Sequence, residues 1–182
     1  MKAVAELADC FEQSGFQIRI VGGAVRDMLL GVAPKDIDMC TDATPDEMKE
    51  IAKRFHLSIN PLGEAHGTML FNVFKWTIEV TTLRIDVETD GRHAEVEFTR
   101  DFEADAARRD LTINAMSMSM DFQVFDFFDG ISDLGNKRLR FVGNADERIK
   151  EDFLRILRFF RMADKFDDAF WDNEALDAIT EN

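Results

Sequence analysis

A glycine-rich turn followed closely by two aspartates constrains this chain more than any other part of its sequence. Apolar residues at 18–21 predict a strand that leads into Gly22 and Gly23, and the apolar spacing of 24–30 predicts a helix after them. Two glycines let the backbone turn tightly and approach a ligand closely. The free N–H groups at the start of the helix, with Arg26 one turn further on, favour a phosphate-bearing ligand.

The two aspartates, Asp36 and Asp38, are predicted to lie on a second strand over residues 36–39. Alternation along a strand places both carboxylates on one face and directs Ile37 into the core. Neighbouring carboxylates repel each other unless a cation lies between them, and Mg²⁺ prefers carboxylate and phosphate oxygens. Each motif alone has a plainer interpretation, as a turn or as a solvated strand edge. Together they predict a Mg²⁺ site at Asp36 and Asp38 and a nucleotidyl-transfer reaction.

Glu79 is a candidate third catalytic carboxylate. It lies in a predicted strand over residues 77–85, where alternation puts it opposite the apolar side chains and toward the face of the aspartates. It could complete the shell of a metal ion or accept the proton of an attacking hydroxyl. An exposed strand glutamate without a chemical role is the alternative.

Residues 101–116 are predicted to be helical and carry a second group of polar candidates. Arg109 could bind phosphate oxygens in bidentate fashion. Asp110 and Asn114, four residues apart on one helix face, could bond ribose hydroxyls. A solvated run of charges is the alternative interpretation.

A long amphipathic helix is predicted over residues 145–166. Asp152 and Arg155 would share one of its faces, where an acceptor beside a donor could pair with the edge of a base, while the two residues between them face the core. A salt bridge between Asp152 and Arg155 is the alternative. Arg158 and Arg161 continue the stripe, and three arginines in a row favour a cleft for a triphosphate or a base.

Composition places the chain among soluble globular proteins. Its 182 residues are 46% hydrophobic, with 17 Phe and no Tyr. No apolar run approaches the roughly 18 residues of a membrane span, so no membrane partner is predicted. Cys10 and Cys40 lack metal-ligand spacing and are predicted to be small core residues in a reducing, cytoplasmic compartment. The oligomeric state is not determined by the sequence.

The net charge of −14 argues against generic nucleic-acid binding. The charge is uneven, however: residues 100–166 hold 12 Lys and Arg against 13 Asp and Glu, whereas residues 167–182 hold six acids and no base. A local cationic groove is therefore compatible with the composition, and any RNA contact should be weak and salt-sensitive.

The remaining elements are predicted from capping and turn residues and from the spacing of apolar residues. Further helices are predicted at 2–14 and from an N-cap at Thr44 to about residue 55, and further strands at 58–60, 68–74 and 124–128. Residues 86–99 are polar and contain Asp90-Gly91, which predicts a mobile surface loop. His66 and His93 have no partners at ligand spacing, so no zinc site is predicted.

These motifs resemble those of the class II tRNA nucleotidyltransferases, the CCA-adding enzymes, and of the related bacterial poly(A) polymerases. The resemblance covers nearly the whole chain and rests on eight segments in the same order. They are the turn at 22–27, Asp36 with Asp38, 66–68 (HGT), 79–82 (EVTT), 90–93 (DGRH), 108–114 (RRDLTIN), 126–130 and 151–155 (EDFLR).

The resemblance implies an α/β (α+β) fold: a polymerase β-type nucleotidyltransferase head with a small mixed sheet backed by helices. It implies a head over residues 1–140 and the start of a helical neck over 141–182. By the same resemblance, the matched residues bind Mg²⁺ (Asp36, Asp38), the incoming nucleotide (Gly23, Arg26, Arg109, Asp110) and its base (Asp152, Arg155, with Arg158 and Arg161 completing the pocket). Residues 86–98 would be the flexible element linked to the switch from C to A addition.

The activity implied is Mg²⁺-dependent addition of CMP and AMP, from CTP and ATP, to the 3′ end of tRNA. Family members are longer, and their tRNA-gripping domains follow the region matched here, so RNA extension is expected to be weak or dependent on those domains. An A-adding polymerase is the alternative within the same class of enzyme, and incorporation of CTP would distinguish CCA addition from addition of A alone. A nucleotide-binding or regulatory module without turnover is the rival from another class.

Overall fold

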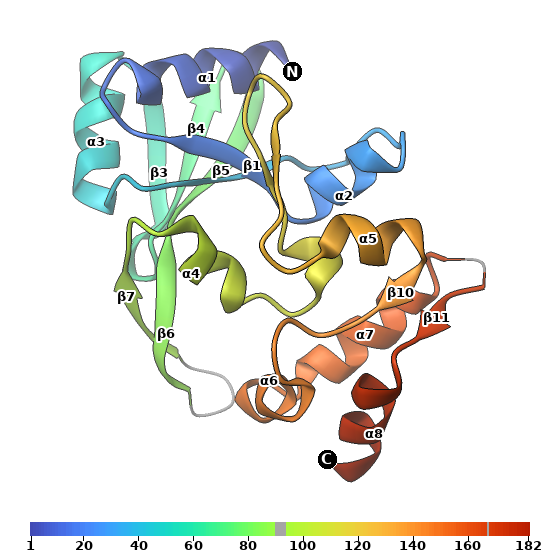
Figure 1. Cartoon of the computed structure of the whole chain (residues 1–182). Coiled ribbons are helices and arrows are strands. Elements are labelled where there is room, and N and C mark those ends of the chain that lie inside the picture. The colour runs from blue at the N-terminus through green and yellow to red at the C-terminus, as the bar shows by residue number, and fades with distance from the viewer. Residues whose placement is uncertain (90–93, 167) are drawn as a thin grey trace.

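The computed structural model describes residues 1–89, 94–166 and 168–182. Its main sheet has seven strands in the order β3-β4-β5-β2-β1-β8-β9 (Figure 1). β2 and β5 run parallel, whereas the other neighbours in this sheet are antiparallel. The strands are β1 (Ile18–Val21), β2 (Asp38–Thr41), β3 (Ser58–Gly63), β4 (Thr68–Val73), β5 (Trp76–Thr82), β8 (Ser117–Met118) and β9 (Val124–Phe125).

Two helices cover one face of this sheet, α1 (Lys2–Glu12) and α3 (Pro45–Arg54) (Figure 1). The apolar stripe of α1 packs on the sheet, where the Phe11 and Phe71 rings meet edge to face with centroids 5.5 Å apart. The predicted N-cap at Thr44 is present: its hydroxyl accepts from the backbone of Glu47, and the Glu47 carboxylate accepts from the Thr44 N–H. The predicted mixed sheet backed by helices is therefore confirmed.

The opposite face of the sheet carries the shorter elements and the C-terminal helices. They are α2 (Gly23–Leu29), the 3₁₀ helices η1 (Glu64–His66) and η2 (Thr112–Asn114), α4 (Phe102–Ala107), α5 (Gly130–Gly135), α6 (Ala145–Glu151), α7 (Leu154–Ala163) and α8 (Asn173–Glu181), with the two-stranded parallel sheet β10 (Arg138–Leu139) and β11 (Phe170–Trp171). Figure 1 shows α6, α7 and α8 at the end of the molecule away from α1.

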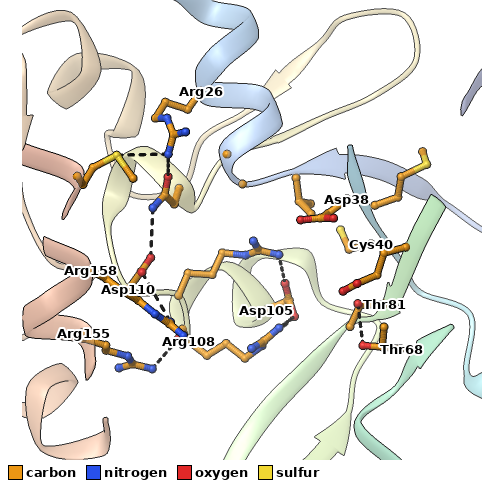
Figure 2. A pocket seen from close by; sticks show the side chains of 18 of the residues that line it. Arg26, Asp38, Cys40, Thr68, Thr81, Asp105, Arg108, Asp110, Arg155 and Arg158 are labelled. Carbon is orange, nitrogen blue, oxygen red and sulfur yellow. Dashed lines mark hydrogen bonds and ion pairs between the residues drawn. The ribbon is translucent and has the colours of Figure 1, made fainter. Parts of the chain in front are cut away.

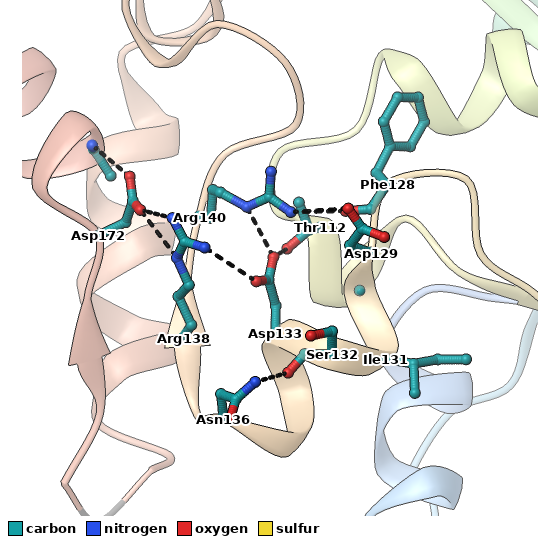
Figure 3. Close-up of polar contacts among 12 residues, drawn as sticks. Thr112, Phe128, Asp129, Ile131, Ser132, Asp133, Asn136, Arg138, Arg140 and Asp172 are labelled. Atoms are coloured by element: carbon teal, nitrogen blue, oxygen red, sulfur yellow. Dashed lines mark hydrogen bonds and ion pairs between the residues drawn. The ribbon is translucent and has the colours of Figure 1, made fainter.

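A buried carboxylate ties η2 to the C-terminal elements (Figure 3). Asp133, on α5, accepts a 2.6 Å hydrogen bond from the Thr112 hydroxyl and a 3.0 Å bond from Nε of Arg140. Arg138 pairs with Asp172, which caps α8. Because both acids are buried, these bonds fix where η2 lies relative to the C-terminal helices.

The prediction of a mobile surface loop at 86–99 is wrong for the residues of this range that the structure describes. Strands β6 (Arg84–Thr89) and β7 (Ala94–Phe98) form an antiparallel hairpin with its own two-stranded sheet. The hairpin forms a sheet of its own, and its strands do alternate, with Ile85 and Val87 on β6 and Val96 and Phe98 on β7. The polar composition of the segment outweighed this alternation in the prediction. The segment Asp90-Gly91-Arg92-His93 lies outside the described residues.

The two helices predicted at 101–116 and 145–166 are both interrupted. After α4 the backbone leaves the helix, and at residues 110–112 it bonds to residues 140–142: the Thr112 N–H donates to Arg140, and the Val142 N–H to Asp110. The second helix breaks at Asp152, whose φ of −156° and ψ of 103° are extended. Tertiary pairing outweighs helix propensity at both places.

No helix among the described residues is long and apolar enough to cross a membrane.

Gly130 allows α5 to touch η2, and we expect Gly130→Ala to destabilise the protein. A Cβ atom at this position would lie 2.4 Å from the carbonyl oxygen of Thr112, which is backbone and cannot move aside cheaply. Overpacking of this kind costs about 1–3 kcal/mol, measurable by urea unfolding. Gly135, at the other end of α5, is the matched control, because a Cβ added there would meet no atom within 4 Å. If Gly130→Ala unfolded at the same urea concentration as Gly135→Ala, the close contact would be refuted.

Candidate active site

A cavity of about 720 Å³ lies between the open face of the sheet and the C-terminal helices (Figure 2). Asp38 and Glu79 line it from the sheet, and many basic side chains line it elsewhere. The basic residues are Arg26, Arg84, Arg108, Arg109, Arg155, Arg158, Arg161 and Lys165. The cavity therefore combines a small acidic area with an extended cationic wall, and its volume suits a small-molecule ligand.

The acidic area arises from the parallel pairing of β2 with β5. Asp38 begins β2 and lies directly opposite Glu79 on β5, as alternation predicts. Desolvation by the cavity walls raises the pKa of Asp38, repulsion by Asp36 adds to this, and Arg109 opposes it. Desolvation and the charge of Asp38 likewise raise the pKa of Glu79, with Arg84 opposing. A cation bound between these groups would remove the repulsion.

Asp36 does not lie on the strand as predicted. It precedes β2, in a bend, and is exposed. Asp36 and Asp38 together line two neighbouring cavities. Asp38 also lines the cavity of about 720 Å³, whereas Asp36 does not. Within the described ranges no cluster of three or more His, Cys, Asp or Glu residues is placed to hold a metal ion. The chain can therefore offer the two aspartates, and other oxygens would have to complete the shell of a metal ion.

The glycine turn brings the backbone close to an arginine. Gly22 has a φ of 67°, and a Cβ there would lie 3.2 Å from Nη1 of Arg109. Arg26 is 4% exposed and is bonded within the protein: Nη1 donates to Asn114 at 2.7 Å (Figure 2), and Nε donates to Asp27 at 2.9 Å. Arg26 lines the cavity as predicted, but it also clamps α2 to η2.

Asp105 organises the cationic wall and was missed by sequence reasoning. Its carboxylate accepts from Nε of Arg108 at 3.0 Å and from Nη2 of Arg109 at 3.1 Å. Burial opposes the charged form, but the Arg109 and Arg108 guanidinium groups outweigh it and lower the pKa of Asp105. The spacing of three and four residues along a helix was the available signal. Arg84, Arg108 and Lys165, which also line the cavity, were missed as well.

Asp110 and Asn114 meet beside the cavity although they do not share a helix. Nδ2 of Asn114 lies 3.4 Å from Oδ1 of Asp110, and Nη1 of Arg158 lies 3.8 Å from Oδ2 of Asp110. The structure thus brings together the predicted residues of this segment through a turn and η2. Their remaining hydrogen-bonding capacity faces the cavity that they line.

Asp152 and Arg155 are bonded through the backbone, where the Arg155 N–H donates to the Asp152 carbonyl at 2.9 Å, but their side chains bond to other partners, which corrects the prediction of a shared helix face. Arg155 is 7% exposed, and its guanidinium donates to the backbone oxygens of Arg148 at 3.0 Å and Arg108 at 3.1 Å. Asp152 instead accepts from the N–H of Leu154 at 2.9 Å and does not line the cavity. Because α6 and α7 are separate, Leu154 is exposed rather than buried.

The far end of the cationic wall is open. The side chains of Arg161 and Lys165 have no hydrogen bond or ion pair within the part of the chain that the structure describes, and the Arg158 side chain is 48% exposed. Arg161 and Lys165 can therefore meet an anionic ligand without breaking internal bonds, whereas Arg158 is already 3.8 Å from the Asp110 carboxylate. Cys40, in contrast, is a buried part of the cavity wall, and burial raises its pKa to about 12, so its thiol stays neutral.

The chain belongs to the family described as the poly(A) polymerase head domain, which matches residues 18–140. The mouse protein named CCA tRNA nucleotidyltransferase 1, mitochondrial, is 51% identical over 184 residues, covering 100% of this chain and 42% of its own. The CCA-adding enzyme of Staphylococcus haemolyticus is 45% identical over 152 residues, covering 82% of this chain and 37% of its own.

Solved structures of similar proteins have the same fold. The CCA-adding enzyme of Bacillus stearothermophilus in complex with CTP superposes on 100% of this chain and 43% of its own, with a TM-score of 0.88 and 31% identity. A tRNA nucleotidyltransferase complexed with a primer tRNA and an incoming ATP analog has a TM-score of 0.77 and 28% identity. This chain spans about two fifths of such relatives. The cytoplasmic location stays a prediction, because mouse and human relatives are named as mitochondrial.

The raised pKa of Asp38 predicts that Asp38→Asn stabilises the protein when divalent cations are absent. The folded state disfavours the charged carboxyl, so the ionised group costs stability above its folded pKa and costs nothing once protonated. We expect a gain of about 0.5–1 kcal/mol at pH 7 by urea unfolding in chelator. The gain should shrink as the pH falls toward 3.8, the ordinary pKa of the group. Asp9→Asn, on the exposed side of α1, should show no such gain, and a destabilised Asp38→Asn would contradict the repulsion.

Proposed function

We propose that this site transfers CMP and AMP from CTP and ATP to the 3′-hydroxyl of tRNA, with release of pyrophosphate and a requirement for Mg²⁺. The observation that carries the proposal is the cavity in which Asp38 and Glu79 face a wall of arginines. A triphosphate carries several negative charges, which such a wall can neutralise. The printed names of the relatives, which include complexes with CTP and with an ATP analog, support the same reaction.

Asp36 and Asp38 are the proposed ligands of Mg²⁺. The fit rests on the desolvation and the repulsion by Asp36 that raise the pKa of Asp38, and on donor atoms that are all oxygen. When bound, Mg²⁺ would lower the pKa of the attacking hydroxyl and neutralise charge on the phosphates. Glu79 is the proposed proton acceptor, since its raised pKa brings the carboxyl closer to that of a base working near neutral pH.

The cationic wall is proposed to hold the nucleotide. Gly22 and Gly23 allow a close backbone approach, and Arg109 and Arg26 present charge that their acidic partners keep in place. Asp110 and Asn114 are proposed to contact the ribose. Arg158, Arg161 and Lys165, which lie at the open end, would contact the phosphates or the base.

Asp152 and Arg155 are the proposed base-selecting pair. Support comes from Arg155, which lies in the cavity wall, and from α7, which carries Arg158 and Arg161 along the same side. Three of the five N–H donors of Arg155 are bonded in this structure, to the carbonyls of Arg108 and Arg148 and to the Glu151 carboxylate, so selection would use the two that remain. We also retain the division into a head at 1–140 and a neck from 141 as a proposal, supported by the end of the family match at 140.

An A-adding activity is the second candidate, and the family description favours it. CTP incorporation separates the two activities.

We expect the chain, mixed with Mg²⁺, CTP, ATP and tRNA lacking its 3′ end, to add C before A when products are resolved at single-nucleotide resolution. Asp38→Asn should lower the rate by at least about 100-fold. Asp46→Asn, an exposed acid on α3, serves as the control. Incorporation of ATP alone would favour the rival, and no incorporation with CTP still bound would favour a binding module.

Arg161→Ala should weaken the binding of CTP in the presence of Mg²⁺ by roughly tenfold, because a charge-assisted bond to phosphate is worth about 1.5–3 kcal/mol. The side chain has no internal partner among the described residues, so the loss cannot come from a broken structural contact. Arg54→Ala, on the remote helix α3, is the matched control for removing one positive charge. Titration calorimetry measures both, and equal affinities would exclude Arg161 from the site.

A further inference from the structure

Aromatic and cationic side chains alternate at the tip of the β4–β5 hairpin, outside the cavity lined by arginines. Phe74 and Trp76 are 64% and 60% exposed. Nζ of Lys75 lies 5.6 Å from the centroid of the Trp76 ring, and Nζ of Lys2 lies 5.4 Å from that of Phe74. Two large aromatic faces are thus held in solvent, each beside a positive charge.

The backbone of this tip is strained. Val73 pairs with Trp76, which leaves Phe74 and Lys75 as a two-residue turn. Phe74 has a φ of 55°, a conformation that turns usually assign to glycine or asparagine. Because the Phe74 ring is exposed, its packing contacts offset little of the energy cost of this backbone conformation. A strained, exposed aromatic residue is a reason to look for a ligand at the tip.

A second cavity, of about 530 Å³, connects this tip to the catalytic acids. Its lining includes Trp76 and Lys35 together with Asp36, Asp38 and Glu79, and the start of the chain at Met1, Ala3 and Val4. The first residues of β5 extend beyond the start of β2, since Asp38 is the first residue of β2 and already lies opposite Glu79. Residues 76–78 of β5 are therefore not paired with β2. Trp76 lies three residues before Glu79, about 10 Å along the strand, so the two side chains leave opposite faces of β5 and a path of one to three nucleotides would pass around this unpaired edge.

We propose that this hairpin tip and cavity bind the unpaired 3′ end of the acceptor RNA, with a base stacked on Trp76. The inference rests on the proposed function: if the nucleotide fills the arginine-lined cavity, the attacking hydroxyl reaches Asp38 and Glu79 from the other side. Lys2, Lys35 and Lys75 lie where RNA phosphates would pass, and they supply local positive charge in a chain of net charge −14. Stacking tolerates any base, as an acceptor site requires.

Fluorescence isolates the proposed contact. The chain has two tryptophans, so Trp171→Phe leaves Trp76 as the only one. A single-stranded RNA of about ten nucleotides, added to this variant, should quench its fluorescence as a base stacks on the indole. In the otherwise unaltered chain, Trp76→Ala should weaken binding of the same labelled RNA by roughly 5–100-fold, and Trp76→Phe should restore most of it. Binding of CTP with Mg²⁺ should stay unchanged in both variants.

A matched control lies at the far edge of the same sheet. Phe122, in the turn between β8 and β9, is 65% exposed and has a φ of 65°, but its neighbour is Asp121 rather than a lysine. Phe122→Ala should leave RNA binding unchanged. RNA that fails to quench Trp76 at concentrations up to roughly 1 mM, or that binds Trp76→Ala as tightly as the unaltered chain, would overturn this site. Failure of the unaltered chain to bind CTP with Mg²⁺ would instead refute the proposed function.

Discussion

The parallel pairing of β2 with β5 is the constraint on which the rest of the site depends. It places Asp38 opposite Glu79, while Met39 and Val80, the next pair in the same register, are fully buried beneath them. The two carboxylates cannot move apart without breaking that buried pair, so their repulsion is built into the fold. Desolvation by burial raises the pKa of both groups, the charge of Asp36 adds to this at Asp38 and that of Asp38 adds to it at Glu79, and positive charge brought to the pair would stabilise both carboxylates. The sheet thus holds two acids in a position that favours the binding of a cation.

The cations opposite these acids divide into two groups that do different work. Arg26, Arg109 and Arg155 are bonded to Asp27, Asp105 and backbone carbonyls, so their positions are set before any ligand arrives. Charges held in place act on a ligand without further reorganisation. Arg158, Arg161 and Lys165 are more exposed and can adjust to what binds. The fixed group defines where negative charge is favoured, and the adjustable group adds affinity.

Sequence reasoning reached the parts of the site that depend on local pattern. The turn at Gly22, the position of Asp38 and the side on which Glu79 lies all follow from alternation and from glycine chemistry. Prediction from the sequence failed where contacts between residues far apart in the chain determine the local structure. The break at Asp152 accompanies bonds from Arg155 to the carbonyl of Arg108, 47 residues away, and helical spacing cannot reveal such a contact. The β6–β7 hairpin was missed because the segment is rich in charged residues, although Ile85, Val87, Val96 and Phe98 alternate with polar residues as in a strand.

The two cavities meet the same acids from different sides, and this arrangement suits two ligands of the same charge. Both a triphosphate and an RNA strand are anions, and a chain with a net charge of −14 repels them at long range. Binding must then come from local features: a dense arginine wall for the smaller, more highly charged ligand, and aromatic stacking with a few lysines for the strand. Neutralising about three phosphates gives only a shallow salt dependence, of slope about −2 for a single strand. Stacking on Trp76 does not depend on salt, so it would become the larger share of RNA affinity as ionic strength rises.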